Sequence, residues 1–303
     1  VKSIYEVPIK YNEEKLDKKI LNIFGIKEKN KANLKVWKDI VSKINSKRKK
    51  ISIAIVGKYV DLKDAYKSLD EALIHGSINN DVDLNTEWVD STKINKNNVN
   101  KILKNYSAIL IPGGFGSRGT EGKIEAIAYA RKYKVPFFGI CFGMQMAVIE
   151  SARNMLGIKK ATSSEFGNGG SHVVGLMSEW IKGKTVQKGS KKNLGGTMRL
   201  GSYKAKLKKN SLISKIYKST VINERHRHRY EVNKNLKSRL EKKGLIFSGL
   251  SPDGSLPETI ELENHPWFIG VQFHPEFKSR PFAPHPLFSS FIKAAKDNSK
   301  KND

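Results

Sequence analysis

The sequence predicts an α/β fold: a doubly wound, mostly parallel sheet with flanking helices and additional strands. Two observations predict it. From residue 51 onwards, short apolar runs alternate with segments in which apolar residues recur at helical spacing. Two of these runs also end at turns, one at Gly113 and Gly114 and the other at Cys141. Because ligand sites of such sheets lie at the carboxyl ends of the strands, these two turns mark the expected site.

The first half of the chain carries the alternating pattern. The run ISIAIVG predicts a buried strand at 51–57, and the next segment places apolar residues at 62, 65, 66, 69, 72 and 73, which is helical spacing. A short helix is expected just before Tyr106. Further strands are expected at 82–89, 107–114 and 135–140, and a further helix at 120–133.

The second half is richer in strands and shows no internal repeat. A closing helix is expected at 287–296, so we expect the sheet domain to span residues 50–298 and a short tail to occupy 299–303. The additional strands are expected at 172–177, 196–207, 244–251, 258–263 and 268–273.

Residues 1–49 are typical of an appendage rather than of a self-sufficient core. The first 50 residues hold 15 Lys and Arg against 6 Asp and Glu. The opening VKSIYEVPIKY looks like a strand or turn, and two helical stretches follow at 16–25 and 34–44. Since the chain begins at Val1 rather than Met, we expect it to have been cut from a longer protein. This composition suits a terminal flap and a linker.

The formal net charge of +27 raises the question of nucleic-acid binding. The chain has 46 Lys but only 10 Arg, whereas proteins that read bases concentrate Arg, whose guanidinium matches phosphates and guanine edges. We therefore expect a solvated lysine surface and no specific nucleic-acid partner. A single cysteine excludes an internal disulfide, and no apolar run approaches a membrane span, so we expect a soluble, cytoplasmic protein.

The pentapeptide GICFG, residues 139–143, has the form of a nucleophile elbow. In such an elbow a sharp strand-to-helix turn exposes the nucleophile, and small flanking residues prevent clashes. Cys141 would stand at a helix N-terminus, where the helix dipole favours a thiolate. An inert buried cysteine is the alternative interpretation.

A thiol nucleophile needs a base and a group that orients the base. The segment FIGVQFHPEF supplies His274 just past a predicted strand, with Glu276 two residues later to fix its tautomer. The other histidines outside the strand ERHRHRYEV fit structural roles: His75 within a helix, His172 at a strand start, and His265 and His285 before prolines.

The glycine-rich segment PGGFGSRG, residues 112–119, can let backbone amides converge. The N–H groups of Gly114 and Phe142 would form an oxyanion hole for a tetrahedral intermediate. A phosphate-binding loop is the alternative, but neither a Walker pattern nor a dinucleotide fingerprint is present. We expect no cofactor and no metal site in this chain.

These segments, in the order PGGFG, GICFGMQ and HPE, resemble the class I glutamine amidotransferases, which use a Cys, His, Glu triad and have a flavodoxin-like fold. The motifs VGKYVDLKDAYKSLDEALIHG, GGTMRLG, ERHRHRYEVN and VQFHPEFKSRP are similar to the glutaminase half of the CTP synthase family. The opening SIYEVP is similar to the last part of that family's amidoligase domain. The resemblance implies that residues 1–49 are an amidoligase remnant with a linker.

The resemblance also implies the chemistry. Cys141 would attack the side-chain amide of L-glutamine, and the ammonia would pass to an amidoligase domain, elsewhere in the full-length chain, that aminates UTP. The full-length enzyme is expected to use ATP and Mg²⁺, to have GTP as a candidate activator and to form a homotetramer. The glutamine-binding residues carried over from the family are Gly114, Phe142, Gly143, Met144, Gln145, Glu165 and Arg229.

The α-carboxylate of glutamine would pair with Arg229 and its α-ammonium with Glu165. Two departures from the family are visible: Phe142 stands where leucine is usual, and Lys188 stands where an arginine is expected near the GTP-response region. The alternatives are a free-standing class I glutaminase serving another acceptor, a γ-glutamyl hydrolase, or a catalytically silent basic module that binds nucleic acid. The strand ERHRHRY, with its alternating Arg and His, fits a half-exposed strand as well as a basic patch.

Overall fold

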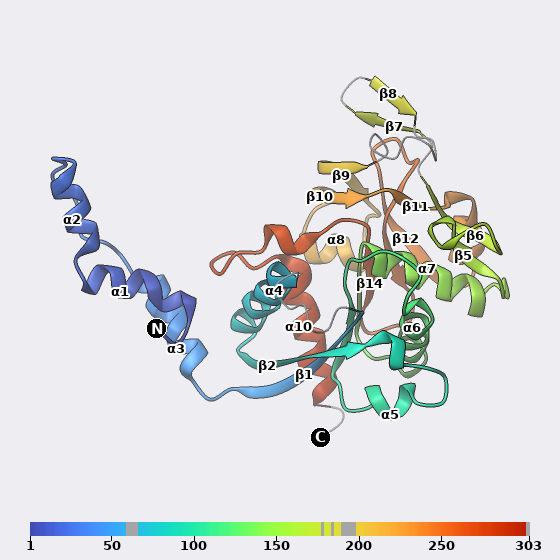
Figure 1. Cartoon of the computed structure of the whole chain (residues 1–303), viewed down its shortest axis with the longest axis horizontal. Coiled ribbons are helices and arrows are strands. Elements are labelled where there is room, and N and C mark those ends of the chain that lie inside the picture. Colours follow the sequence, from blue (N-terminus) through green and yellow to red (C-terminus); the bar gives the residue numbers. More distant parts are fainter. Residues whose placement is uncertain (59–65, 177–178, 183–184, 189–197, 301–303) are drawn as a thin grey trace.

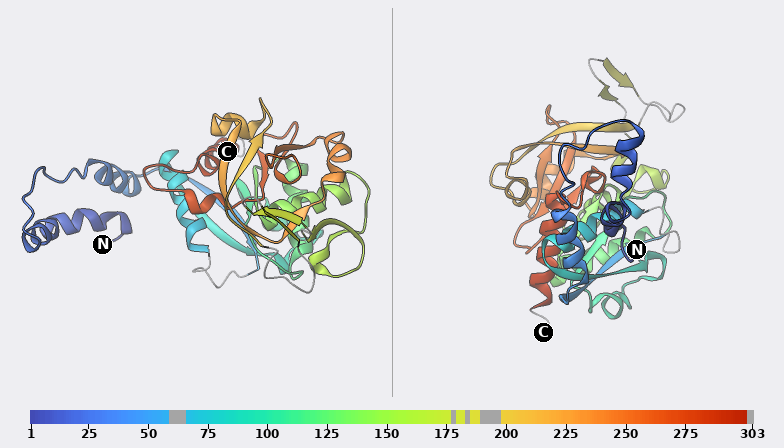
Figure 2. Two further views of the ribbon diagram at one scale, coloured as in Figure 1. Left: turned by 90° about the horizontal axis from the view of Figure 1, so that it is seen from above. Right: turned by 90° about the vertical axis from the view of Figure 1, so that its left-hand side faces the viewer.

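The structure is a computed structural model of the chain, and it describes residues 1–58, 66–176, 179–182, 185–188 and 198–300 (Figure 1). One large sheet forms the centre of the molecule, and helices cover both of its faces. The N-terminal helices project to one side of this body, as the turned views also show (Figure 2).

The large sheet has nine strands among the described residues and is parallel in one half and antiparallel in the other. The five parallel strands carry the turns that the sequence singles out, and the other strands extend the sheet, which confirms the predicted doubly wound fold with additional strands. In spatial order the strands are β10 (Val221–His228), β9 (Arg199–Leu207), β12 (Leu245–Leu250), β13 (Pro257–Leu262), β14 (Phe268–Val271), β4 (Phe137–Ile140), β3 (Ala108–Ile111), β1 (Lys49–Gly57) and β2 (Val82–Asp90).

Two smaller sheets lie beside the large one. One joins β11 (Tyr230–Val232), β6 (Ser171–Leu176) and β5 (Ala161–Ser163), and the other pairs β7 (Glu179–Lys182) with β8 (Thr185–Lys188). Because β10 ends at His228 and β11 begins at Tyr230, the chain passes from the large sheet to a small one at this point.

Two hydrophobic cores cover the two faces of the large sheet. Side chains alternate between the faces along each strand, so Ile109 and Ile111 enter one core while Leu110 enters the other. The first core is covered by α5 (Val99–Leu103), α6 (Thr120–Tyr133), α7 (Phe142–Asn154) and α9 (Lys237–Glu241). The second is covered by α4 (Lys67–Asn79), α8 (Leu212–Tyr217) and α10 (Pro286–Ser299).

The N-terminal region is helical: α1 (Val7–Glu13), α2 (Leu16–Ile23) and α3 (Lys35–Asn45). Of the strand or turn expected at the opening, the strand is wrong, because Ser3 accepts a hydrogen bond from the Tyr5 N–H and starts a short 3-10 turn that leads into α1. This region attaches to α4 through a small core of Tyr5, Ile40 and Ile78. Among the residues that the structure describes, no helix is long and apolar enough to cross a membrane.

Candidate active site

Cys141 sits at a strained turn between β4 and α7. Its φ of 51° and ψ of −100° are unusual for a residue with a side chain. The two flanking glycines make the turn possible: a Cβ on Gly143 would lie 2.2 Å from the Ile111 carbonyl oxygen, and one on Gly139 would lie 2.8 Å from the Gly143 backbone. The geometry is that of a nucleophile elbow, in which strain is stored at the reactive residue.

The neighbouring strand β14 holds the elbow in place. The Cys141 N–H donates to the Val271 carbonyl at 2.6 Å, and Ile140 of β4 lies opposite Val271 in the parallel pair. The next residue, Gln272, places its side-chain amide 3.7 Å from the Cys141 sulfur. Gln272 stands within the segment VQFHPEF, but nothing in the sequence indicates that its side chain reaches Cys141.

His274 and Glu276 form a tight pair just beyond β14. The Nδ1 atom of His274 lies 2.7 Å from Oε1 of Glu276, and the imidazole stacks on the Phe277 ring with centroids 5.3 Å apart. The backbone N–H of His274 donates to the backbone carbonyl of Arg225 at 2.8 Å, which connects this turn to β10. The structure thus brings together the base and orienting group that the sequence predicts.

The protonation of His274 links it to Cys141. Burial opposes a charge on the imidazole, but the Cys141 side chain, by charge and hydrogen bonding, and then Glu276 together raise the pKa of His274 to about 11. The raised pKa favours the imidazolium form of the ring. An imidazolium beside the sulfur stabilises a thiolate, which is the nucleophilic form of cysteine.

A pocket of about 480 Å³ lies beside Cys141 and His274. Its wall includes Cys141, His274 and Glu276, with Gly113 and Gly114 from the turn after β3. It also includes Arg227, which sequence reasoning did not single out. The available signal was the alternation along β10, where arginines are exposed and histidines are buried.

The two predicted oxyanion-hole residues lie close to each other. A Cβ on Gly114 would lie 3.8 Å from the Phe142 ring. Phe142 is the first residue of α7, so its N–H has no acceptor four residues earlier in the helix. Its ring is buried against Phe166, with Lys123 on another side at 5.4 Å from the ring centroid.

The other elbow residues differ in what they expose. Gly143 is packed against the β3 backbone, and the Met144 side chain is fully buried in the core. Gln145 is buried too, and its amide donates to the Tyr230 carbonyl at 2.9 Å and to the Gln272 side-chain oxygen at 3.3 Å. Gly143 and Met144 can therefore reach a ligand only through their backbone.

Glu165 and Arg229 lie beside Tyr230 rather than in the wall of the 480 Å³ pocket. Burial raises the pKa of the Tyr230 hydroxyl, the Glu165 charge raises it further and the Arg229 charge opposes the change, so both charges lie near this side chain. Glu165 accepts a hydrogen bond from the Gly116 N–H at 2.7 Å. One acidic and one basic group thus act on the Tyr230 side chain, and the acidic one also contacts the loop after β3.

The remaining predicted residues are placed as follows. Lys188 ends β8, and its side chain lies outside the described part of the structure. The four histidines given structural roles each have a partner within the fold, for example His265, whose Nε2 lies 3.1 Å from the Ala130 carbonyl. No group of three or more His, Cys, Asp or Glu among the described residues is arranged to hold a metal ion.

Comparisons with known proteins show which proteins the chain resembles. The family model described as glutamine amidotransferase class-I matches residues 61–294. The chain is 64% identical over 298 residues to CTP synthase of Pelagibacter ubique (strain HTCC1062), covering 98% of this chain and 55% of that protein. It is 58% identical over 301 residues to CTP synthase of Rhizobium meliloti (strain 1021), covering 99% of this chain and 56% of that protein.

Among solved structures, the glutaminase domain of Trypanosoma brucei CTPS with bound acivicin matches with a TM-score of 0.74 and 38% identity. The match covers 82% of this chain and 94% of that chain. The chain thus spans nearly all of a solved glutaminase domain, but only about half the length of the curated relatives that it matches.

Proposed function

The chain belongs to the class I glutamine amidotransferase family, and from this membership we propose that it hydrolyses the side-chain amide of L-glutamine with Cys141 as nucleophile. The observation that carries the proposal is the arrangement of Cys141, His274 and Glu276: a strained thiol, an imidazolium next to it and a carboxylate behind the ring. These three groups supply the nucleophile, the acid and base, and the orienting residue that the reaction needs.

In the proposed reaction, the Cys141 sulfur attacks the amide carbon, and the resulting oxyanion accepts hydrogen bonds from the N–H groups of Gly114 and Phe142. His274 gives its proton to the amide nitrogen, the carbon–nitrogen bond breaks and ammonia leaves. Water then attacks the thioester while His274 takes up a proton, and glutamate is released. Glu276 keeps Nδ1 protonated, so that Nε2 is the atom that exchanges protons with sulfur and substrate.

Recognition of glutamine would use the groups around Tyr230. We assign the α-carboxylate to Arg229 and the α-ammonium to Glu165, since ion pairs with those groups are the strong hydrogen bonds available. The backbones of Phe142, Gly143 and Met144 would line the ligand. The Gln145 side chain would act on the ligand indirectly, because its hydrogen bond to the Tyr230 carbonyl holds the backbone next to Arg229.

The activity of the whole protein is a separate proposal, because the chain spans about half of its CTP synthase relatives. We propose that residues 1–49 are the end of an amidoligase domain and that this domain uses the ammonia to aminate UTP, with ATP and Mg²⁺. A homotetramer, a cytoplasmic location and activation by GTP belong to the same proposal. Because Lys188 stands where an arginine is expected, activation by GTP has to be measured on the full-length protein.

An electrophilic glutamine analogue tests the glutaminase proposal. Incubation should attach one molecule of the analogue to Cys141, as located by mass spectrometry of peptides, and the chain should release glutamate from glutamine. The Cys141→Ala variant is the control and should remain unlabelled. Labelling elsewhere, or none, would favour the catalytically silent module. Hydrolysis of γ-glutamyl peptides in preference to glutamine would favour the γ-glutamyl hydrolase.

A further inference from the structure

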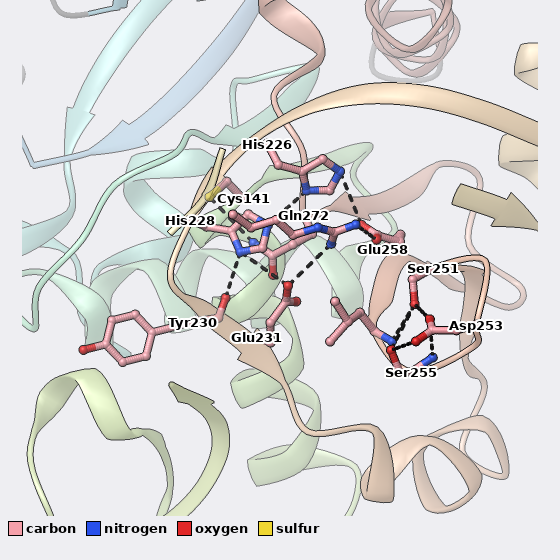
Figure 3. Close-up of polar contacts among 12 residues, drawn as sticks. Cys141, His226, His228, Tyr230, Glu231, Ser251, Asp253, Ser255, Glu258 and Gln272 are labelled. Atoms are coloured by element: carbon pink, nitrogen blue, oxygen red, sulfur yellow. Dashed lines mark hydrogen bonds and ion pairs between the residues drawn. The ribbon is translucent and has the colours of Figure 1, made fainter. Parts of the chain in front are cut away.

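A cluster of buried charged and titratable side chains lies behind the elbow, outside the pocket wall (Figure 3). We call it the buried charge cluster. Each member is more than nine-tenths buried, and they come from four different strands that meet at this place. Its members are Arg199 of β9, His226 and His228 of β10, Glu231 of β11 and Glu258 of β13.

Arg199 connects the two carboxyl groups. Its Nη2 donates to Oε1 of Glu258 at 2.5 Å, and its Nη1 lies 3.5 Å from Oε1 of Glu231. One guanidinium balances one carboxylate, so a neutral cluster needs one further proton. Burial agrees with this count, because it raises the pKa of both glutamates and lowers the pKa of both histidines.

The two histidines form a chain between the carboxyl groups. Nδ1 of His226 lies 3.0 Å from Nε2 of His228, so one proton occupies the gap. At the outer ends, Nε2 of His226 lies 3.5 Å from Oε2 of Glu258, and Nδ1 of His228 lies 3.2 Å from the Tyr230 carbonyl and 3.5 Å from Oε1 of Glu231.

Only two arrangements of neutral rings satisfy the central gap. If His226 donates to His228, then Nδ1 of His228 carries a proton for the Tyr230 carbonyl. If His228 donates to His226, then the bare Nδ1 of His228 faces the lone pairs of that carbonyl. The distance of 3.2 Å is that of a hydrogen bond, which favours the first arrangement.

The Tyr230 carbonyl joins the cluster to the site. It accepts from His228 on one side and from the Gln145 amide, at 2.9 Å, on the other. Gln145 in turn contacts Gln272, whose amide lies 3.7 Å from the Cys141 sulfur. Arg229, assigned above to the α-carboxylate of glutamine, is the residue immediately before Tyr230.

We propose that His228 is a positioning residue for glutamine recognition: its Nδ1–H holds the Tyr230 carbonyl and so fixes the backbone that presents Arg229 to the substrate. The inference rests on the proposed glutaminase function. His228 takes no part in bond making. Its loss should weaken binding of glutamine while leaving the reactivity of the Cys141 thiol unchanged.

Two reagents separate these effects. The electrophilic glutamine analogue must be recognised before it reacts, whereas iodoacetamide needs only a reactive thiol. In His228→Leu, the rate of labelling by the analogue should fall about tenfold, the expected loss for one buried hydrogen bond, and the iodoacetamide rate should stay within about twofold. The KM for glutamine should rise by a similar factor with little change in kcat.

Conservative variants distinguish positioning from general damage. His228→Asn places an amide N–H close to the position of Nδ1 and should restore most of the analogue rate, whereas His228→Gln, whose amide lies near Nε2, should not. His265→Leu is the matched control, since it loses a contact of the same kind to the Ala130 carbonyl, and His265 precedes β14 whereas His274 follows it, so the two lie at opposite ends of that strand. It should leave the ratio of the two labelling rates unchanged.

If the ratio of the analogue and iodoacetamide labelling rates is unchanged in both His228→Leu and His228→Gln, the positioning role is wrong. If the wild-type chain is not labelled by the analogue at all, the proposed function itself is wrong.

Discussion

The ring carbon Cε1 of His274 lies only 2.7 Å from the position that a Cβ atom on Gly113 would occupy. A Cβ on the next residue, Gly114, would meet only the Phe142 ring, at an ordinary 3.8 Å. Gly113 therefore leaves the room that the imidazole fills, while Gly114 is proposed to contribute its N–H.

This contrast predicts different outcomes for two adjacent alanine substitutions. Gly113→Ala should displace His274, which acts as both acid and base. The imidazole would then no longer reach the Cys141 sulfur, and kcat for glutamine should fall by about a hundredfold or more. Gly114→Ala keeps its backbone N–H and should lose less than about tenfold. Steady-state kinetics of both variants, with circular dichroism to verify folding, make the comparison. Equal losses would contradict the steric role of Gly113.

The elbow predicts a stability effect at Gly143. An added Cβ would lie 2.2 Å from the Ile111 carbonyl oxygen, a backbone atom that cannot move without disturbing β3. Gly143→Ala should lower the free energy of unfolding by about 3 kcal/mol, as expected for overpacking. Gly169→Ala is the control, since nothing lies within 4 Å of its added Cβ, and it should be close to neutral. Urea denaturation measures both values.

The raised pKa of His274 predicts a titration that NMR can follow. The Cε1–H signal should keep its imidazolium shift through neutral pH and change only as the pH approaches about 11. In Cys141→Ala the contribution of Cys141 is lost and only Glu276 still opposes the effect of burial, so the pKa of His274 should fall. A wild-type titration near the ordinary histidine value of 6.5 would contradict the ion pair.

The proposed division of labour predicts that one substitution uncouples two activities in the full-length protein. Cys141→Ala removes the atom that forms the thioester, so glutamine hydrolysis should fall by several orders of magnitude. Formation of CTP from UTP with an added ammonium salt should survive, because free ammonia bypasses the glutaminase site. Persisting glutamine-dependent CTP formation would show that Cys141 is not the nucleophile. Loss of both activities in a folded protein would contradict the separation between the domains.

The lysine-rich surface predicts weak, salt-sensitive binding to nucleic acid. With a net charge of +27, some attraction to random duplex DNA is expected, but it should disappear at about 200 mM salt, since it depends on released counterions. Fluorescence anisotropy at increasing salt measures this. Binding that is tight at high salt, or selective for a sequence, would favour a nucleic-acid function.

The local features of the site could be predicted from the sequence because each is encoded by adjacent residues. The elbow depends on two glycines around Cys141, and the pairing of His274 with Glu276 depends on a spacing of two. The alternation around His226 left a half-exposed strand and a basic patch open, and the structure has a strand in which the histidines are buried and the arginines exposed.

The buried charge cluster could not be predicted, because its members are distant in the sequence and meet only when the sheet forms. No residue near Arg199 in the sequence indicates that Glu258 is its partner. The two side chains come into contact because β9, β12 and β13 are neighbours in the sheet. Gln272 was missed although it stands two residues before His274, because its contact with Cys141 depends on how β4 and β14 pair. The helical start of the chain was missed because its apolar spacing resembles a strand, and the cap from Ser3 decided the outcome.

The parallel register between β4 and β14, in which Ile140 lies opposite Val271, also limits how this site can change by insertion or deletion. One residue added to either strand would reverse which face each following side chain meets, and so would separate the thiol from the imidazole. Length changes in the turns at the opposite end of these strands leave the register intact. Functional variants should therefore carry their insertions and deletions in those turns and keep the lengths from Phe137 to Cys141 and from Phe268 to His274 fixed.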